Sequence, residues 1–179
     1  VSNYSLKQMD IFRQAASLHV VQPPYNIFER HIEHDVLPYV HKHTLKTLTY
    51  GALCRGLLAG RMKPDTQFTG DDLRKVDLKF QQPRYGQYLD AVAQLERFAR
   101  ERFKKSVLAL AVRWLLDQPD VSIALWGARR PDQLDPVDEA MGWTIDDMSR
   151  KAIDQIVHKT IKDPVGPEFM APPSREAVT

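Results

Sequence analysis

The sequence is poor in cysteine and has no excess of one charge sign. Of 179 residues only Cys54 is a cysteine, so no disulfide can form within the chain, which favours a reducing, cytoplasmic location. The 25 basic and 23 acidic residues leave a formal net charge of +2, too small for a nucleic-acid-binding face. No apolar run approaches the roughly 20 residues that cross a bilayer. We therefore expect neither a nucleic-acid nor a membrane partner.

The sequence also lacks an initiator methionine. Residues 1–5 have the pattern of a strand end that passes into a helix cap at Ser5. We therefore expect that other residues precede Val1 in the intact protein. With 43% hydrophobic residues, the chain can form a core as one domain or as part of a larger one.

Hydrophobic periodicity predicts strands alternating with helices. The predicted strands cover residues 19–22, 44–50 and 121–126, the last of them as a buried strand. The predicted helices cover residues 5–17, 32–43, 88–103, 106–116, 131–141 and 144–158, with Thr144 as the cap of the last. Most of 52–84 is predicted to be a long loop, of a length often found in functional lids. The alternation favours a parallel sheet covered by helices, and ligands bind such sheets at the carboxyl ends of the strands.

The segment 121–133 has the features of a phosphate-binding site. An apolar run ends at Gly127, which allows a sharp turn, and Pro131 suits the first position of a helix. The start of a helix attracts anions, and Arg129 and Arg130 add bidentate donors. Two solvated arginines on a surface turn would give the same spacing.

Other polar residues follow the remaining predicted strand ends. Ser2, Asn3, Gln22 and Tyr50 should meet segment 127–130 on one rim of the sheet. Taken singly, Tyr50 could be a core aromatic, and Gln22 could simply satisfy backbone groups.

Metal and nucleophile chemistry receive little support from the sequence. The histidines come without Cys, Asp or Glu at ligand spacing, so we expect no metal site. Four of them gather near one predicted helix: His31, His34, His41 and His43. No partner base is evident for Cys54, so a nucleophilic role is not expected.

Four segments taken together resemble the aldo-keto reductase family. They are residues 1–5, 22–26, 50–58 and 127–133, and the likeness is closest to the bacterial branch with the general-stress and inositol-operon reductases. The resemblance implies a (β/α)₈ TIM barrel. Residues 1–160 would form its C-terminal half, from about strand 5 or 6 to strand 8. Residues 161–179 would form a C-terminal tail that is loop or disordered.

The resemblance implies an NADP(H) site made of several segments. Ser2, Asn3 and Gln22 would bind the nicotinamide carboxamide, and Tyr50 would stack on its ring. Other residues would hold the rest of the cofactor: Gly51, Ala52, Leu53, Cys54 and Arg55 along the pyrophosphate, Arg61 and Arg74 closing over it, and Gly127, Ala128, Arg129 and Gln133 at the adenosine end.

The resemblance also implies a specificity for NADP. Arg129 would bind the 2′-phosphate, which favours NADP over NAD. In many members of the family, a Glu-Asn pair follows the glutamine that corresponds to Gln133, and this pair contacts adenine. Pro136 and Val137 occupy that place here, so adenine contacts are not expected from this position.

No residue of this chain matches the family's catalytic Asp-Tyr-Lys-His tetrad, so no catalytic residue is assigned. We expect the 179 residues to be an incomplete record, a proteolytic product or a truncated form of a parent of about 320 residues, within the size range of this barrel. The parent would reduce aldehydes or ketones with NADPH. Its partners would be a small carbonyl substrate and the N-terminal half of the barrel. The alternative is a non-catalytic NADP-binding subunit or an inactive fragment.

Overall fold

A computed structural model of the chain describes residues 1–167. Its sheet has three parallel strands in the order β1 (Val20–Val21), β2 (Lys46–Thr49) and β3 (Ile123–Ala124). Val20 is paired with Lys46, and Leu48 with Ile123. The predicted parallel α/β arrangement is therefore confirmed, although each strand is shorter than its apolar pattern.

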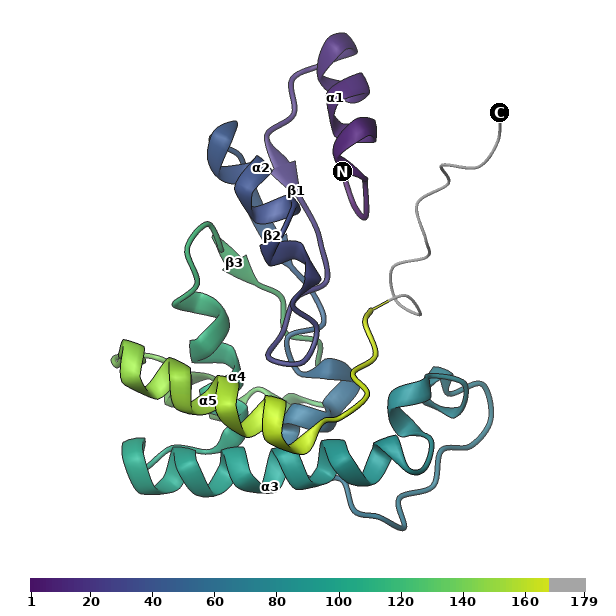
Figure 1. Ribbon diagram of the computed structural model, residues 1–179, viewed down its shortest axis with the longest axis vertical. Helices are drawn as coiled ribbons and strands as arrows, with labels where there is room; N and C mark the ends of the chain where they lie inside the picture. Colours follow the sequence, from purple (N-terminus) through teal and green to yellow (C-terminus); the bar gives the residue numbers. More distant parts are fainter. Residues whose placement is uncertain (168–179) are drawn as a thin grey trace.

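The helices lie around and beyond this small sheet (Figure 1). They are α1 (Leu6–Ala15), α2 (Val36–Lys42), α3 (Arg84–Phe103), α4 (Val107–Leu116) and α5 (Asp147–Thr160). In Figure 1, α1 and α2 lie toward one end of the molecule, and α3 and α5 run side by side at the other. Short 3₁₀ helices make up much of the rest: His31–Glu33, Cys54–Ala59, Leu73–Lys75, Leu78–Phe80, Pro131–Gln133 and Asp135–Ala140.

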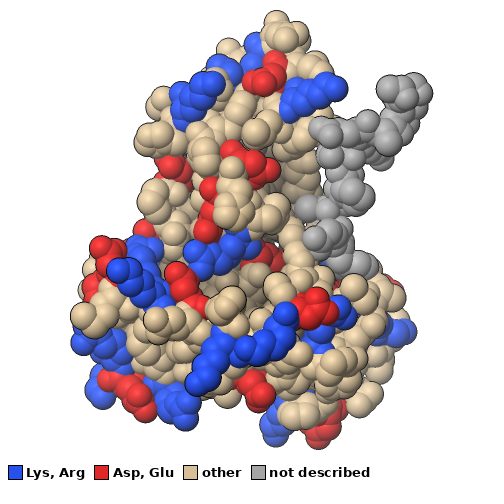
Figure 2. Space-filling model, in the orientation of Figure 1, with Lys and Arg blue, Asp and Glu red and all other residues tan. Residues whose placement is uncertain are grey.

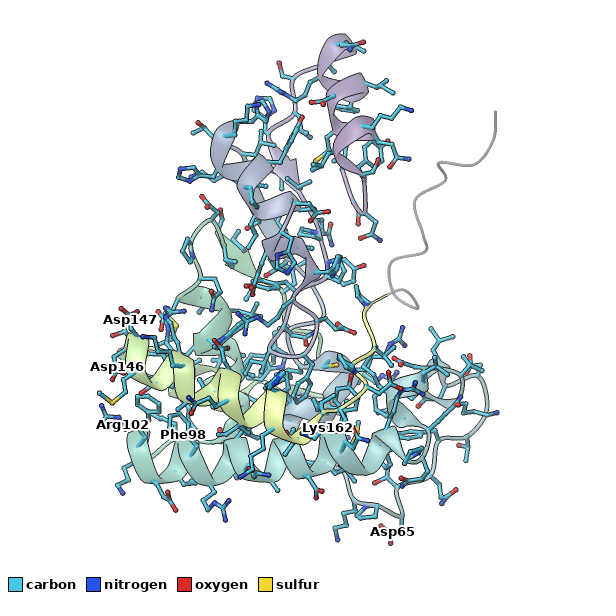
Figure 3. All side chains as sticks on the ribbon, viewed as in Figure 1. Asp65, Phe98, Arg102, Asp146, Asp147 and Lys162 are labelled. Carbon is cyan, nitrogen blue, oxygen red and sulfur yellow. The ribbon has the colours of Figure 1, made fainter. Side chains whose placement is uncertain are left out.

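Several predicted helices differ in the structure: the one expected over 32–43 is a 3₁₀ turn at His31–Glu33 followed by α2 from Val36. The helix expected over 131–141 is wrong: two 3₁₀ segments stand there, because Pro136 lacks the N–H that an α-helix needs and its ring clashes with the preceding turn. The last helix is capped by Asp146, not by Thr144. The Asp146 carboxylate accepts a hydrogen bond from the Ser149 N–H at 2.8 Å and an ion pair from Arg102 at 3.0 Å (Figure 3).

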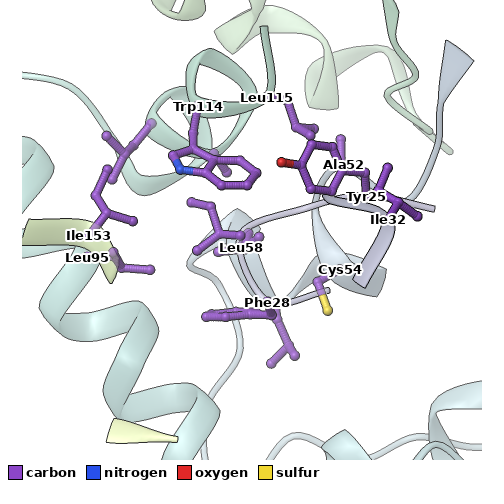
Figure 4. Close-up of a cluster of buried hydrophobic side chains, with 14 of the residues drawn as sticks. Tyr25, Phe28, Ile32, Ala52, Cys54, Leu58, Leu95, Trp114, Leu115 and Ile153 are labelled. Carbon is purple, nitrogen blue, oxygen red and sulfur yellow. The ribbon is translucent and has the colours of Figure 1, made fainter. Parts of the chain in front are cut away.

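The main core lies between the helices and the turns that follow β1 and β2. Trp114 of α4 is 1% exposed and packs against Tyr25, with ring centroids 5.2 Å apart (Figure 4). Eight of the ten residues of α4 are buried, which explains its nearly continuous apolar sequence. The sequence predicted a helix over 106–116, and the structure places α4 at Val107–Leu116 with Ser106 as its cap.

The two faces of the sheet differ in burial. Val21, Thr47 and Thr49 are buried on one face, whereas Val20 and Leu48 are only half-buried on the other, and Ile123 is 50% exposed. The prediction of a buried strand over 121–126 is therefore wrong within the described residues, because nothing in them covers this second face. Three strands cannot close the eight-stranded barrel that the resemblance implies.

The segment between β2 and α3 is more ordered than the predicted loop. It contains three short 3₁₀ helices, and the Phe68 ring packs against Phe80 of the last of them, with centroids 5.3 Å apart. Helix α3 starts at Arg84, four residues before the predicted start. After α5, residues 161–167 are irregular, as expected, while the rest of the predicted tail lies outside the described residues.

Candidate functional site

Four of the polar residues predicted at the strand ends contact one another in pairs, Ser2 with Gln22 and Asn3 with Tyr50. Isolated bridges pair Ser2 with Gln22 and Pro24 with Tyr50, which continues the parallel pattern past the carboxyl ends of β1 and β2. The Ser2 hydroxyl donates to the Gln22 carbonyl at 3.1 Å, and the Tyr50 hydroxyl donates to Asn3 Oδ1 at 3.0 Å. Tyr50 is only partly buried, so it is not an ordinary core aromatic. Partial burial raises the pKa of its hydroxyl. A flat, neutral ring thus lies on the rim beside amide and hydroxyl groups.

Residues 51–60 form an unusually strained turn directly after Tyr50. The backbone has positive φ at Gly51 (74°), Cys54 (45°), Arg55 (53°), Gly56 (94°) and Gly60 (71°). For residues other than glycine this conformation costs about 1–2 kcal/mol each, and such strain is concentrated at functional sites. At Gly60 a Cβ would lie 2.8 Å from Val107, so a side chain is excluded there by contact as well.

Beneath this turn lies a group of charged residues that sequence reasoning missed, the buried charge cluster of Glu29, Asp77, Lys79 and Arg55. The Lys79 ammonium, with no exposed side-chain surface, lies 2.9 Å from Glu29 and 3.2 Å from Asp77. Arg55 Nε lies 3.5 Å from the other oxygen of Asp77. Only the fold reveals the cluster, because charged residues in a polar loop are normally solvated and the sequence carried no signal to the contrary.

The two loop arginines predicted to close over the cofactor differ from each other in their surroundings: Arg74 is held by other side chains, and Arg61 is exposed to solvent. Arg74 forms an ion pair with Asp72, its Nε 2.9 Å from Oδ1, and stacks over Phe68 at 4.6 Å. Arg74 also donates to the Arg55 carbonyl at 3.5 Å, so it lies against the strained turn. Arg61 is exposed.

Charges of this loop and of the segment 127–133 affect one another's carboxylates. The Arg74 guanidinium holds the pKa of Asp72 well below its usual range, and Arg129 adds a smaller effect of the same sign. In the same way Arg130 lowers the pKa of Asp132, with a contribution from Arg61.

The segment 127–133 is folded around the Gln133 side chain. Gln133 Oε1 accepts hydrogen bonds from the Arg129 N–H at 2.7 Å and the Arg130 N–H at 3.2 Å. Arg130 pairs with Asp132 at 2.9 Å, whereas no ion pair of Arg129 is found in residues 1–167. Both arginines are exposed. Of the two arginines, only Arg130 thus has an ion-pair partner among the described residues.

Two parts of the phosphate-site prediction are wrong. Gly127 does not have a positive φ, and a Cβ there would meet no atom within 4 Å, so glycine is not needed for a sharp turn. Pro131 begins a 3₁₀ helix of three residues, too short to present the dipole of an α-helix. Because the Arg129 and Arg130 N–H groups already donate to Gln133, any anion binding here depends on the arginine side chains.

Residues 1–167 offer little support for a metal site or for a nucleophilic cysteine. No group of three His, Cys, Asp or Glu side chains there could hold a metal ion. Cys54 is fully buried, and burial raises the pKa of its thiol well above the usual value. The described helices include none long and apolar enough to cross a membrane. Lys, Arg, Asp and Glu are interspersed over the face shown in Figure 2.

The sequence comparison decides the family. A model of the aldo/keto reductase family matches residues 1–158. The chain belongs to the aldo/keto reductase family. It is 57% identical over 178 residues to the aldo-keto reductase YhdN of Bacillus subtilis, covering 99% of this chain and 54% of that protein. It is also 29% identical over 117 residues to a putative voltage-gated potassium channel subunit beta of Schizosaccharomyces pombe, covering 63% of this chain and 34% of that one.

A solved structure gives the same result for the fold. The glycerol dehydrogenase AKR11B4 of Gluconobacter oxydans superimposes with a TM-score of 0.86 at 53% identity, over 93% of this chain and 50% of that one. The chain thus spans about half the length of these relatives and about half of an aldo/keto reductase TIM barrel. Members of the family typically use NAD(P)H and bind small carbonyl substrates.

Proposed function

We propose that the intact barrel containing this chain is an NADPH-dependent oxidoreductase of aldehydes or ketones in the cytoplasm. This chain would supply its C-terminal, NADP-binding half. The observation that carries the proposal is the meeting of Asn3, Gln22 and Tyr50 on one rim, followed directly by the strained turn 51–60. Strain of this kind persists where a backbone is shaped for a ligand.

The chemistry of the donor set fits NADP from end to end. The Ser2 hydroxyl and the Asn3 and Gln22 amides offer donors and acceptors to a carboxamide, and Tyr50 offers a flat ring to the nicotinamide. Residues 51–55, with Arg61 and Arg74 nearby, would face the pyrophosphate. Gly127, Ala128, Arg129 and Gln133 would hold the adenosine end.

The cofactor would supply the hydride that passes to the substrate's carbonyl carbon. This chain's residues would fix which face of the nicotinamide points to the substrate, and precise placement contributes strongly to the rate of such a step. The proton donor would come from the tetrad of the other half. The isolated chain should therefore bind without catalysis.

The half-exposed second face of the sheet supports a partner of this kind. Val20, Leu48 and Ile123 line an open hollow together with Lys46 at the amino-terminal ends of the strands. Apolar strand faces require cover, and further barrel strands would provide it. We infer that the N-terminal half of the barrel packs there.

A chimera provides the test. The N-terminal half of the Bacillus subtilis relative, joined ahead of Val1, should consume NADPH when given 4-nitrobenzaldehyde, followed by absorbance. The intact relative is the positive control, and the 179-residue chain alone should show no turnover. A folded chimera that binds NADPH without turnover would refute the reductase proposal, and turnover by the isolated chain would refute the assignment of the tetrad to the other half.

A second candidate is a non-catalytic NADP-binding subunit. The similarity to the putative channel subunit of Schizosaccharomyces pombe favours keeping it. Both candidates predict NADPH binding, and only the first predicts carbonyl-dependent oxidation of NADPH, so the same assay separates them.

A further inference from the structure

We propose that Lys79 is a positioning residue. Through its buried carboxylate partners it holds the first part of the strained turn 51–60, residues 51–56, in a cofactor-binding shape before the cofactor binds. The proposal rests on the proposed function for the identity of the ligand. The contacts of Lys79 itself are independent of that function.

Lys79 connects three parts of the chain. Its ammonium pairs with Glu29, in the segment after β1, and with Asp77, in the segment before α3. It also donates a hydrogen bond to the Gly166 carbonyl at 3.0 Å, which lies beyond α5. All three carboxylate and ammonium groups have fully buried side chains, so water cannot screen or replace these contacts.

Each carboxylate partner of Lys79 is linked to one residue of the strained turn: Glu29 to Gly51 through Asn26, and Asp77 directly to Arg55. Glu29 accepts a hydrogen bond from Asn26 Nδ2 at 2.6 Å, and the same Nδ2 donates to the Gly51 carbonyl at 3.0 Å. Asp77 reaches Arg55 Nε at 3.5 Å. Gly51 and Arg55 both have positive φ, which costs glycine little and Arg55 more, so the two arms attach to the left-handed part of the turn, one of them at a strained residue.

Buried charge is a poor means of stabilising a fold. Desolvation of buried ions offsets much of their attraction, and apolar residues of similar volume often stabilise as well or better. Ion pairs and hydrogen bonds are directional, however, so they fix positions that apolar packing leaves adjustable. Burial by itself would lower the pKa of the Lys79 ammonium, yet Glu29 and Asp77 raise it, so the cation persists at neutral pH. These properties fit a role in fixing the geometry of a turn.

The test compares Lys79→Met with Lys75→Met. Lys75 is exposed, lies in the same loop and carries the same charge, so it is a matched control. In the cofactor-free chain, hydrogen–deuterium exchange of residues 51–58 should speed up in Lys79→Met, while exchange in α4 stays slow. Lys75→Met should match the wild type. Unchanged exchange in 51–58, or equal acceleration in α4, would overturn the proposal.

Ligand binding to the chimera gives the second readout. Lys79→Met should weaken the binding of NADPH by about tenfold, because the turn would then have to be ordered on binding. The affinity for 2′-AMP should stay unchanged, because that ligand has the 2′-phosphate but no pyrophosphate. Equal weakening of both ligands would indicate a global effect and refute the positioning role.

A second variant covers the case in which Lys79→Met does not fold. The double variant Glu29→Gln/Lys79→Met removes one charge of each sign, so no additional uncompensated charge is buried. It should still show faster exchange in 51–58. If wild-type protein binds no NADPH, the proposed function fails, whereas the exchange measurement still decides the role of Lys79.

Discussion

The contrast between Arg129 and its neighbour Arg130 gives the sharpest test of the adenosine end. Arg130 is held by Asp132 at 2.9 Å, whereas Arg129 has no ion pair among the described residues. Arg129→Ala should therefore remove the cation that we propose binds the 2′-phosphate of NADPH. NADH has no such phosphate, so its affinity should hardly change.

The size of this effect follows from the exposure of the site. A hydrogen bond to a charged group contributes about 1.5–3 kcal/mol. Because Arg129 is exposed, water and salt screen its charge, and the lower end of that range applies. A loss of about 1.5 kcal/mol corresponds to roughly tenfold weaker NADPH binding.

Fluorescence titration of the chimera with NADPH and NADH measures both affinities. Arg130→Ala is the matched control, and we expect it to weaken NADPH less than Arg129→Ala does. The difference caused by Arg129→Ala should shrink as salt is raised. Equal weakening of NADPH and NADH by Arg129→Ala would refute the 2′-phosphate role.

Three further predictions concern the chain itself. Trp114→Ala should lower the free energy of unfolding in urea by about 3–5 kcal/mol, because it empties a buried site against Tyr25; a change below about 1 kcal/mol would contradict this packing. Asp146→Ala should lower the midpoint of urea unfolding, whereas Thr144→Ala should leave it unchanged. Hydrogen bonding from Ser149 lowers the pKa of Asp146. The stability that Asp146 contributes should therefore be present at neutral pH and disappear as its carboxyl is protonated in acid. Cys54 should react slowly with a thiol reagent at pH 8 in the folded chain and fast in denaturant, because burial raises its pKa; rapid reaction when folded would show that the turn opens.

Local signals allowed several elements to be predicted from the sequence. Ser5 caps α1 as expected, because a hydroxyl that accepts from a backbone N–H acts within a few residues. The order of strands and helices followed in the same way from apolar spacing. Where two local signals competed, prediction failed: Asp146 replaced Thr144 as a cap, and Pro136 broke an expected helix.

The candidate site likewise has one part that the sequence predicted and one part that it did not. Sequence motifs were enough to assign the family and to predict that Asn3, Gln22 and Tyr50 would meet on one rim, since parallel strands bring their carboxyl ends to one edge. Their roles toward a cofactor stay predictions. The buried charge cluster was not predicted, because Glu29, Asp77 and Lys79 are up to 50 positions apart and each looks like a surface residue by itself.

The sequence by itself determined the family, the alternation of strands and helices, and the residues at the strand ends, because these depend on short-range patterns and motifs. Only the tertiary structure decided which charges are buried, which face of the sheet is uncovered, and which of two adjacent arginines is already paired. These properties depend on groups that folding brings together from distant positions, where burial strengthens electrostatic interactions that water would otherwise screen.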